Sequence, residues 1–208
     1  MRNGSCVLIV FLILIISGCA TGNRIPLDYS GVDTGYAIIS IGHTKETQYS
    51  SYKFLFRTVD KKAENMVGYW APVFLKKHKG DFENDRSIGT VELLRLPPGE
   101  YEIYNFDIFM NLGLIQTNYK AKTDFSIPFI VKPKKATYIG EYIADNLGHN
   151  FIDASIGGAY FIISDKKARD VEIVNNNNPN IEFIHVSNAV PSVDKIGCPL
   201  LTANEIKK

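Results

Sequence analysis

Hydrophobic and polar residues alternate with a period of two along much of the chain from Tyr36 onward. In the segment 51–59 the aromatic side chains share one face, while Lys53 and Arg57 share the other. The segment 125–131 repeats this pattern. Such alternation of aromatic and β-branched residues is typical of a half-buried strand. We expect the core to include the apolar side chains of these two segments, which are Phe54, Phe56, Phe125, Ile127, Phe129 and Val131.

Other short β-rich segments are separated by turn-rich sequence, and they span residues 36–41, 90–96, 101–106, 137–145, 159–164 and 181–187. In the segment 137–145, Ile139 and Ile143 fall on one face, and Tyr138 and Tyr142 fall on the other. Pro128 has no N–H to donate to a sheet, so its strand belongs at an edge or at a bend. Repeated short strands with turns between them predict a β-sandwich or a barrel.

The segment 164–174 has a helical pattern instead, and Ser164 or Asp165 is its candidate N-cap. One stripe carries apolar residues, which are Ala168, Val171 and Val174. A run of asparagines followed by Pro179 ends the segment. We expect a short C-terminal helix packed at an end of the sandwich, and the alternative is a strand through residues 171–174.

The sharpest local signal is the sequence LPPGEYEI at residues 96–103. Pro98 presets φ for the second position of a turn, and Gly99 supplies the positive φ that a type II turn needs next. Both flanking segments are strand-like, so the pattern predicts a hairpin-like corner.

The same sequence resembles a signature of immunoglobulin-like and transthyretin-like β-sandwiches, which include carboxypeptidase-regulatory-like modules. It is also similar to a group of uncharacterised bacterial lipoproteins, in which a PGxY corner is followed by an apolar run and then by YIG. In this chain those two features are residues 128–131 and 138–140. The resemblance implies a single antiparallel β-sandwich, and it brings no known activity.

The N-terminal segment has a different pattern, because its residues are uninterruptedly apolar from Val7 to Ile16. This run is far shorter than the ~20 residues that a helix needs to span a bilayer. Arg2 before it, and the small residues Ser17 and Gly18 after it, are typical of an export signal.

The residues Ile16, Ser17, Gly18 and Cys19 resemble the lipobox of bacterial lipoproteins, in which an aliphatic residue and two small residues precede a cysteine. In that family a signal peptidase recognises the first three residues and cuts before the cysteine, whose thiol carries a diacylglyceryl group. The resemblance implies that the mature chain begins at Cys19 and is held in a membrane by acyl chains such as palmitate. The alternatives are an ordinary secretory signal with a chance cysteine and a retained membrane anchor.

The resemblance also suggests which membrane holds the protein. Many lipoproteins of the inner membrane have aspartate after the lipidated cysteine, and this chain has Ala20. We therefore expect the cell outer membrane. The predicted segments are a signal peptide over 1–18, a lipidated N-terminus and flexible tether over 19–34, and a β-sandwich domain over 35–208.

Charge and length narrow the class of protein further. The chain has 23 Lys and Arg residues and 22 Asp and Glu residues, so loss of Arg2 with the signal leaves no formal net charge. This balance argues against a broad nucleic-acid or anionic-lipid footprint, either of which would require clustered positive charge. The remaining length fits a single domain with one core.

The sequence has no recognised catalytic or cofactor motif, and we predict no catalytic residue, cofactor or metal. The acidic segment 81–85 lacks the EF-hand pattern, which favours a surface loop over a calcium site. The histidines lack the spacing of zinc ligands. Cys198 has no partner cysteine in the mature chain, which indicates an inert thiol or a link between chains. Tyr69 and Trp70 could line a sugar or peptide groove, although such a pair is more often core.

Three functions remain open. The first is a non-enzymatic, lipid-anchored envelope protein that binds a protein partner or has a structural role. The second is an accessory lipoprotein of a secretion apparatus, by analogy with the transthyretin-like lipoprotein of type VI secretion. The third is an envelope hydrolase, which would need acids such as Asp107, Glu141 and Asp145 to meet on folding. We prefer the first, because the sequence carries an anchor signal and no catalytic motif.

Overall fold

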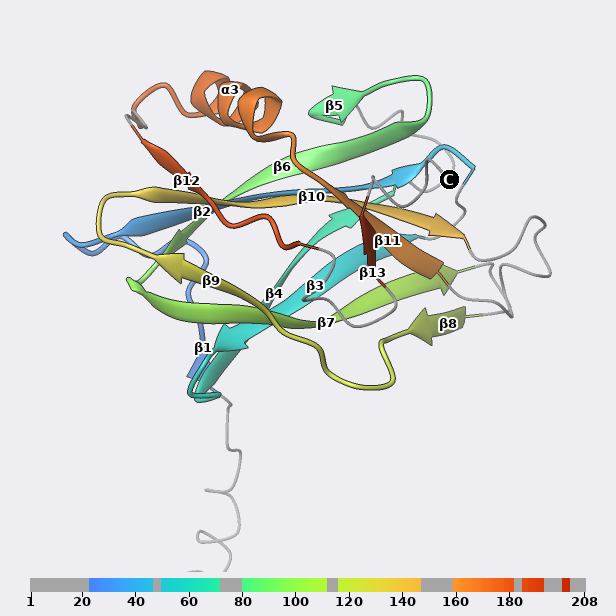
Figure 1. Cartoon of the computed structure of the whole chain (residues 1–208), viewed down its shortest axis with the longest axis horizontal. Coiled ribbons are helices and arrows are strands. Elements are labelled where there is room, and N and C mark those ends of the chain that lie inside the picture. Colours follow the sequence, from blue (N-terminus) through green and yellow to red (C-terminus); the bar gives the residue numbers. More distant parts are fainter. Residues whose placement is uncertain are drawn as a thin grey trace, which may run out of the picture.

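A computed structural model of the chain describes residues 23–46, 50–71, 80–111, 116–146, 159–181, 185–192 and 200–202. Within these residues the protein is mainly β, with two mixed sheets and one helix (Figure 1). The predicted signal peptide over residues 1–18, the predicted lipid attachment at Cys19 and the lone Cys198 lie outside the described residues.

The first sheet has six strands in the order β1-β4-β3-β7-β8, and β9 also pairs with β7. Its strands are β1 (Asn23–Arg24), β3 (Ser51–Thr58), β4 (Ala63–Trp70), β7 (Gly99–Asn111), β8 (Gln116–Tyr119) and β9 (Ile127–Val131). The long β7 pairs with β3 along one edge, and with β9 and then β8 along the other.

The second sheet has seven strands in the order β13-β11-β10-β2-β6-β5, and β12 also pairs with β10. Its strands are β2 (Gly35–Thr44), β5 (Phe82–Glu83), β6 (Ser87–Leu96), β10 (Ala136–Asn146), β11 (Ala159–Ser164), β12 (Val186–Asn188) and β13 (Leu200–Thr202).

Both sheets contain parallel as well as antiparallel pairs. The parallel pairs are β1 with β4, β2 with β10, β10 with β12, and β11 with β13. The prediction of a mainly β chain with a short helix near the C-terminus is therefore confirmed, whereas the expected purely antiparallel arrangement is not.

An aromatic core lies between the two sheets. Phe54 of β3 contacts Tyr142 and Phe161 of the other sheet, with ring centroids 4.7 and 4.5 Å apart. The predicted core residues all belong to this cluster, although Phe125 is only partly buried and packs against its margin. Pro128 is exposed on β9, whose described pairing is to β7 alone, as expected of an edge strand.

A β-bulge in β10 changes which of its side chains face this core. The register with β2 shifts at Ile139, and the following Gly140 has a φ of 134°. As a result, Ile139 and Tyr142 face the core between the sheets, whereas Tyr138 and Ile143 face outward. The predicted separation of isoleucines from tyrosines is wrong, because one extra residue reverses the alternation that follows it.

The corner at Pro97–Pro98 passes the chain from one sheet to the other. β6 belongs to the seven-stranded sheet and β7 to the six-stranded sheet, so the strands that flank the corner do not pair as a hairpin. The φ of Gly99 is not in the left-handed region, which excludes the predicted type II turn. Instead, the hydroxyl of Tyr101 donates to the carbonyl of Pro97 at 2.7 Å, and burial raises the pKa of Tyr101 to about 12.

The helix α3 (Lys167–Asn177) covers the outer face of the seven-stranded sheet rather than an end of the molecule (Figure 1). Its N-cap is Lys166, so neither predicted cap residue occupies that position. Asp170 and Val174 are its buried residues, while Ala168 of the predicted stripe is exposed. In the part of the chain that the structure describes, no helix is both long and apolar enough to cross a membrane.

The chain after Asn23 lies against both sheets. β1 pairs with the start of β4, and Asp28 forms a β-bridge with Arg95 of β6. Ile25 is buried in the core, and its carbonyl accepts a hydrogen bond from Asn65 Nδ2 at 2.6 Å. The segment expected to be a tether therefore joins the fold from Asn23 onward.

Candidate functional site

A groove of about 460 Å³ lies where an edge of each sheet is left open, between β4 and β6. Its lining combines apolar side chains with one carboxylate and includes Leu27, Met66, Gly68, Trp70, Leu93 and Glu92. A concave, mostly apolar surface with a few polar groups is the usual form of a binding site in proteins.

The open edge of β4 runs from Met66 to Trp70. Among the described residues, β1 pairs only with Ala63 and Glu64, and β3 occupies the other edge. The carbonyl of Glu64 faces β1, and strand alternation turns the backbone groups of Met66, Gly68 and Trp70 to the same side. The N–H of Met66 bonds to a neighbouring side chain rather than to a strand.

The facing edge of β6 is open over residues 90–94. Among the described strands, β5 pairs only with Ile88 and Gly89, and the N-terminal segment reaches this edge only at Arg95. The N–H of Val91 is bonded by the side chain of Asp81 at 2.9 Å. The groove is thus bounded by two strand edges that no described strand pairs with at these residues.

Glu92 places a carboxyl group inside this groove. Burial raises the pKa of Glu92, the hydroxyl of Thr90 opposes that rise, and the charge of Asp81 adds to it. A cation in the groove would favour the ionised form of Glu92 and offset the cost of its burial. The groove therefore suits a ligand that brings both apolar contact and a positive charge.

Tyr69 and Trp70, which could have been core or groove, both line the groove, but they differ in exposure. Tyr69 is buried in the core, while Trp70 is 57% exposed at the rim of the groove. Lys53 Nζ lies 5.4 Å from the centroid of the Trp70 ring, and Met66 on the same strand is 43% exposed. Both aromatic residues line the groove, so its aromatic content was visible in the sequence.

Behind Tyr69 the core contains a histidine. The ring of His43 stacks on Tyr52 with centroids 5.1 Å apart and lies 5.6 Å from the ring of Tyr69. His43 Nδ1 lies 2.7 Å from the carbonyl of Thr44, and burial lowers the pKa of His43. At neutral pH this histidine is an uncharged part of the core.

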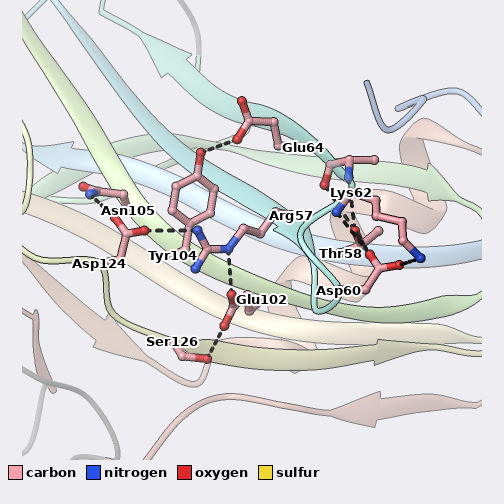
Figure 2. Close-up of polar contacts among 11 residues, drawn as sticks. Arg57, Thr58, Asp60, Lys62, Glu64, Glu102, Tyr104, Asn105, Asp124 and Ser126 are labelled. Atoms are coloured by element: carbon pink, nitrogen blue, oxygen red, sulfur yellow. Dashed lines mark hydrogen bonds and ion pairs between the residues drawn. The ribbon is translucent and has the colours of Figure 1, made fainter. Parts of the chain in front are cut away.

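Arg57 on the outer face of the six-stranded sheet joins several polar groups (Figure 2). Its Nε donates to Glu102 at 2.7 Å, and its Nη1 donates to Asp124 at 3.1 Å. The guanidinium lies 4.2 Å from the centroid of Tyr104, and Ser126 donates to Glu102 at 2.6 Å. These contacts tie the segment before β9 to β3 and β7.

A second arginine network lies beneath α3. Asp170 is fully buried and accepts hydrogen bonds from Ser40, from the hydroxyl of Tyr138 at 2.7 Å and from Nε of Arg169 at 2.7 Å. The guanidinium of Arg169 also lies 2.8 Å from Glu141. Burial and the charge of Asp170 raise the pKa of Tyr138. The contacts with Ser40, Tyr138 and Glu141 fasten the helix to the sheet.

The acids considered for a hydrolase do not form one constellation. Asp107 belongs to the six-stranded sheet and pairs with Lys120 at 3.6 Å, whereas Glu141 and Asp145 belong to the other sheet. Thr44 and Tyr160 donate to Asp145 at 2.9 and 3.1 Å. Across the described ranges, no three His, Cys, Asp or Glu side chains gather where they could hold a metal ion.

The acidic segment 81–85 is described, and its residues make contacts within the segment and with neighbouring strands, including the bond from Val91 N to Asp81. Asn84 bonds the backbone of Arg86 and Ser87, and Glu83 pairs with Lys45 at 2.9 Å. His78 and His149 lie outside the described residues.

Glu92 was not predicted from the sequence. A signal for it was nevertheless present, since strand alternation places Glu92 on the same face as the apolar Leu94 and Leu96.

No family model matches the chain, and no curated protein matches it. Among solved structures, the chain is similar to a leucine-rich repeat protein from Bacteroides thetaiotaomicron VPI-5482, with 10% sequence identity and a TM-score of 0.33. The match covers 54% of this chain and 14% of that chain. A likeness at this level transfers neither fold nor function.

Proposed function

We propose that this protein is a lipid-anchored bacterial envelope protein that has no enzymatic activity and binds a segment of a protein partner. The observation that carries the proposal is the sequence Ile16-Ser17-Gly18-Cys19, which follows directly on the apolar run. Acyl chains on Cys19 would hold the protein stably, because two or more chains bind a membrane far more firmly than one. The proposed location is the outer membrane, since Ala20 replaces the aspartate of inner-membrane lipoproteins.

The groove between β4 and β6 is the proposed binding surface, and an extended peptide with a basic side chain fits its chemistry. The open edge of β4 can pair with an added strand, which is a common mode of peptide recognition. Met66 and Trp70 supply exposed apolar surface beside that edge. Glu92, with Asp81 nearby, supplies the negative charge that attracts lysine or arginine.

We also propose that the two sheets form an immunoglobulin-like or transthyretin-like β-sandwich. Their shared aromatic core supports this assignment. The hydrogen bond from Tyr101 to the carbonyl four residues upstream supports it as well, because sandwiches of this type often carry such a tyrosine corner.

Site-specific photo-crosslinking in intact cells tests the binding role. A photoreactive amino acid would replace Met66 or Leu93 in the groove, and Ile130, an exposed apolar residue of β9, would serve as the matched control. We expect one discrete adduct from both groove positions, mapped by mass spectrometry to a partner segment that contains lysine or arginine, and no such adduct from Ile130.

The variant Glu92→Lys tests the chemistry of the same adduct. Reversal of this charge should abolish crosslinking from Met66 while the protein remains folded and anchored. An adduct that forms equally from Ile130, or that persists in full with Glu92→Lys, would contradict the proposed surface.

A further inference from the structure

One end of the fold gathers the N-terminal segment and several loops (Figure 1). These are β1, residues 30–34, the β3–β4 turn at 59–62, the corner at 97–98 and the β9–β10 turn at 132–135. Hydrogen bonds join them, since Val59 N donates to Glu100 O at 3.0 Å and Lys134 N donates to Thr34 O at 2.9 Å. We call this region the N-terminal loop end.

The N-terminal loop end exposes both valine and lysine. Val32 is 94% exposed and Val59 is 48% exposed, and each sits in a loop that projects from the sheets. The exposed basic residues around them are Arg24, Lys61, Lys62, Lys132, Lys134 and Lys135. Nearby acids include Asp33, which accepts a hydrogen bond from Tyr29, and the exposed Asp28 and Glu100.

The β3–β4 turn is held in shape by its own polar groups (Figure 2). Asp60 accepts hydrogen bonds from Thr58 Oγ1 at 2.6 Å and from Lys62 N at 3.2 Å, and its other oxygen lies 2.8 Å from Lys62 Nζ. These contacts leave Val59 and Lys61 projecting from a defined turn.

The described loops at the opposite end of the molecule have more exposed acidic than basic residues. They expose Glu46, Asp81, Glu83 and Asp85, against Lys45 and Arg86. Anionic lipid head groups attract lysine and arginine near the membrane surface, and the attraction fades within about a Debye length. The described residues of the two ends therefore differ in the attraction that they would feel toward such a surface.

The distance from the predicted lipid to the fold is short. Asn23 already pairs with Ala63, and it follows Cys19 by four residues. An extended chain spans at most about 3.6 Å per residue, so the anchor lies within roughly 14 Å of Asn23. A domain held this closely cannot turn either end to the membrane with equal ease.

We propose that the N-terminal loop end is a membrane-contacting surface that lays its lysines against anionic lipid head groups and its exposed valines at the interface. The proposal rests on the lipid anchor proposed above. It gives the domain a fixed orientation, in which the acidic end and the Trp70 end of the groove point away from the lipid.

Fluorescent probes at single cysteines test this orientation in the full-length lipoprotein. In a Cys198→Ser background, an environment-sensitive dye would be attached at Val32→Cys or Val59→Cys, with Asp85→Cys as the far-end control. The protein would be reconstituted in vesicles of phosphatidylethanolamine and phosphatidylglycerol that carry a quencher at the lipid interface. We expect at least twofold stronger quenching at the two near-end positions than at Asp85→Cys.

Charge reversal provides the second arm. The double variant Lys132→Glu and Lys135→Glu should reduce near-end quenching at least twofold, as should vesicles in which phosphatidylcholine replaces phosphatidylglycerol. The matched double variant Arg86→Glu and Lys122→Glu reverses two exposed charges outside this end and should leave the quenching unchanged.

Mass spectrometry of the same preparation separates the two proposals. A lipidated Cys19 with equal quenching at both ends would overturn the orientation and leave the anchor intact. An unmodified Cys19 would overturn both. Equal effects of the two double variants would overturn the role of the lysines.

Discussion

An arginine lies against the outer face of each sheet, Arg57 from β3 and Arg169 from the covering helix α3, and the two have similar partners in different surroundings. Arg57 contacts Glu102, Asp124 and the ring of Tyr104. Arg169 contacts Asp170, Glu141 and the ring of Phe82, whose centroid is 4.0 Å away. Each group thus combines a guanidinium, two carboxylates and an aromatic ring.

The difference lies in what covers the carboxylates. The side chain of Asp124 is 48% exposed, whereas that of Asp170 is fully buried beneath α3. Removal of one partner from a buried pair leaves an uncompensated charge and costs far more than the same change in a solvated pair. The link between Arg169 and the buried Asp170 is therefore a structural element, while the link between Arg57 and the half-exposed Asp124 contributes little to stability.

Loss of Asp170 should have the largest effect. Asp170→Ala removes the acceptor of three hydrogen bonds and leaves Arg169 partly unpaired. We expect a loss of about 3–5 kcal/mol in the free energy of unfolding, measured by urea denaturation of the detergent-solubilised protein. Asp124→Ala is the open-face control and should cost less than about 1 kcal/mol. Similar costs for the two variants would contradict the comparison.

The bulge that turns Tyr138 toward α3 depends on Gly140. Because φ is 134° there, Gly140→Ala forces a side chain into a conformation that it rarely adopts. We expect a cost of about 1–3 kcal/mol in unfolding free energy. Gly99→Ala is the matched control, since its φ is not in the left-handed region and the nearest atom to its added Cβ would be 3.4 Å away. A larger cost for Gly99→Ala than for Gly140→Ala would contradict the description of the corner, in which Gly99 has no left-handed backbone conformation.

The two tyrosines that accompany the arginines should respond unequally. The Tyr138 hydroxyl donates to Asp170 and accepts from Lys166 N at 3.1 Å, so Tyr138→Phe should cost about 1–2 kcal/mol. Tyr104 donates to Glu64 at 2.8 Å on the open face, and Tyr104→Phe should cost about 0.5 kcal/mol or less. Thermal unfolding of both variants in the same buffer would show which substitution costs more. A larger cost for Tyr104→Phe than for Tyr138→Phe would contradict this prediction.

Glu102→Gln should have the smallest effect on the free energy of unfolding, and this effect should depend on pH. Burial acts to raise the pKa of Glu102, but Ser126 and Arg57 outweigh it and lower the pKa below the ordinary 4.5. The ionised group therefore adds stability above pH 4.5, and this contribution is lost as pH falls through the lowered value. Urea midpoints of Glu102→Gln and the parent should differ at pH 7, and the difference should shrink as pH falls below 4.5. A constant difference would show that the charge is immaterial.

Many core residues could be predicted from the sequence, whereas the positions that depart from regular alternation could not. Alternation placed Phe54 and Phe129 correctly because a regular strand preserves its period. It failed in β10, since the extra residue at Ile139 is set by pairing with β2. It also missed Asp170 on the buried face of α3, because its partners Ser40 and Tyr138 are distant in sequence.

The groove was only half visible in the sequence. Trp70 was a candidate because exposed aromatic residues often line binding sites. Its setting depends on β1 and β5 being too short to cover β4 and β6, and pairing lengths of this kind are decided by tertiary contacts. Glu92 could have been noticed as a charged residue on an apolar face.

The mass of the N-terminal residue tests the central claim, a lipid anchor at Cys19, most directly. Protein extracted from membranes would be digested and its N-terminal peptide analysed by mass spectrometry, with Cys19→Ser as the control. The claim predicts a peptide that begins at Cys19 and carries a diacylglyceryl group, and a Cys19→Ser form that is neither processed at that position nor held by lipid. A mature chain that begins elsewhere, or a Cys19→Ser form that is processed and membrane-bound like the parent, would contradict it.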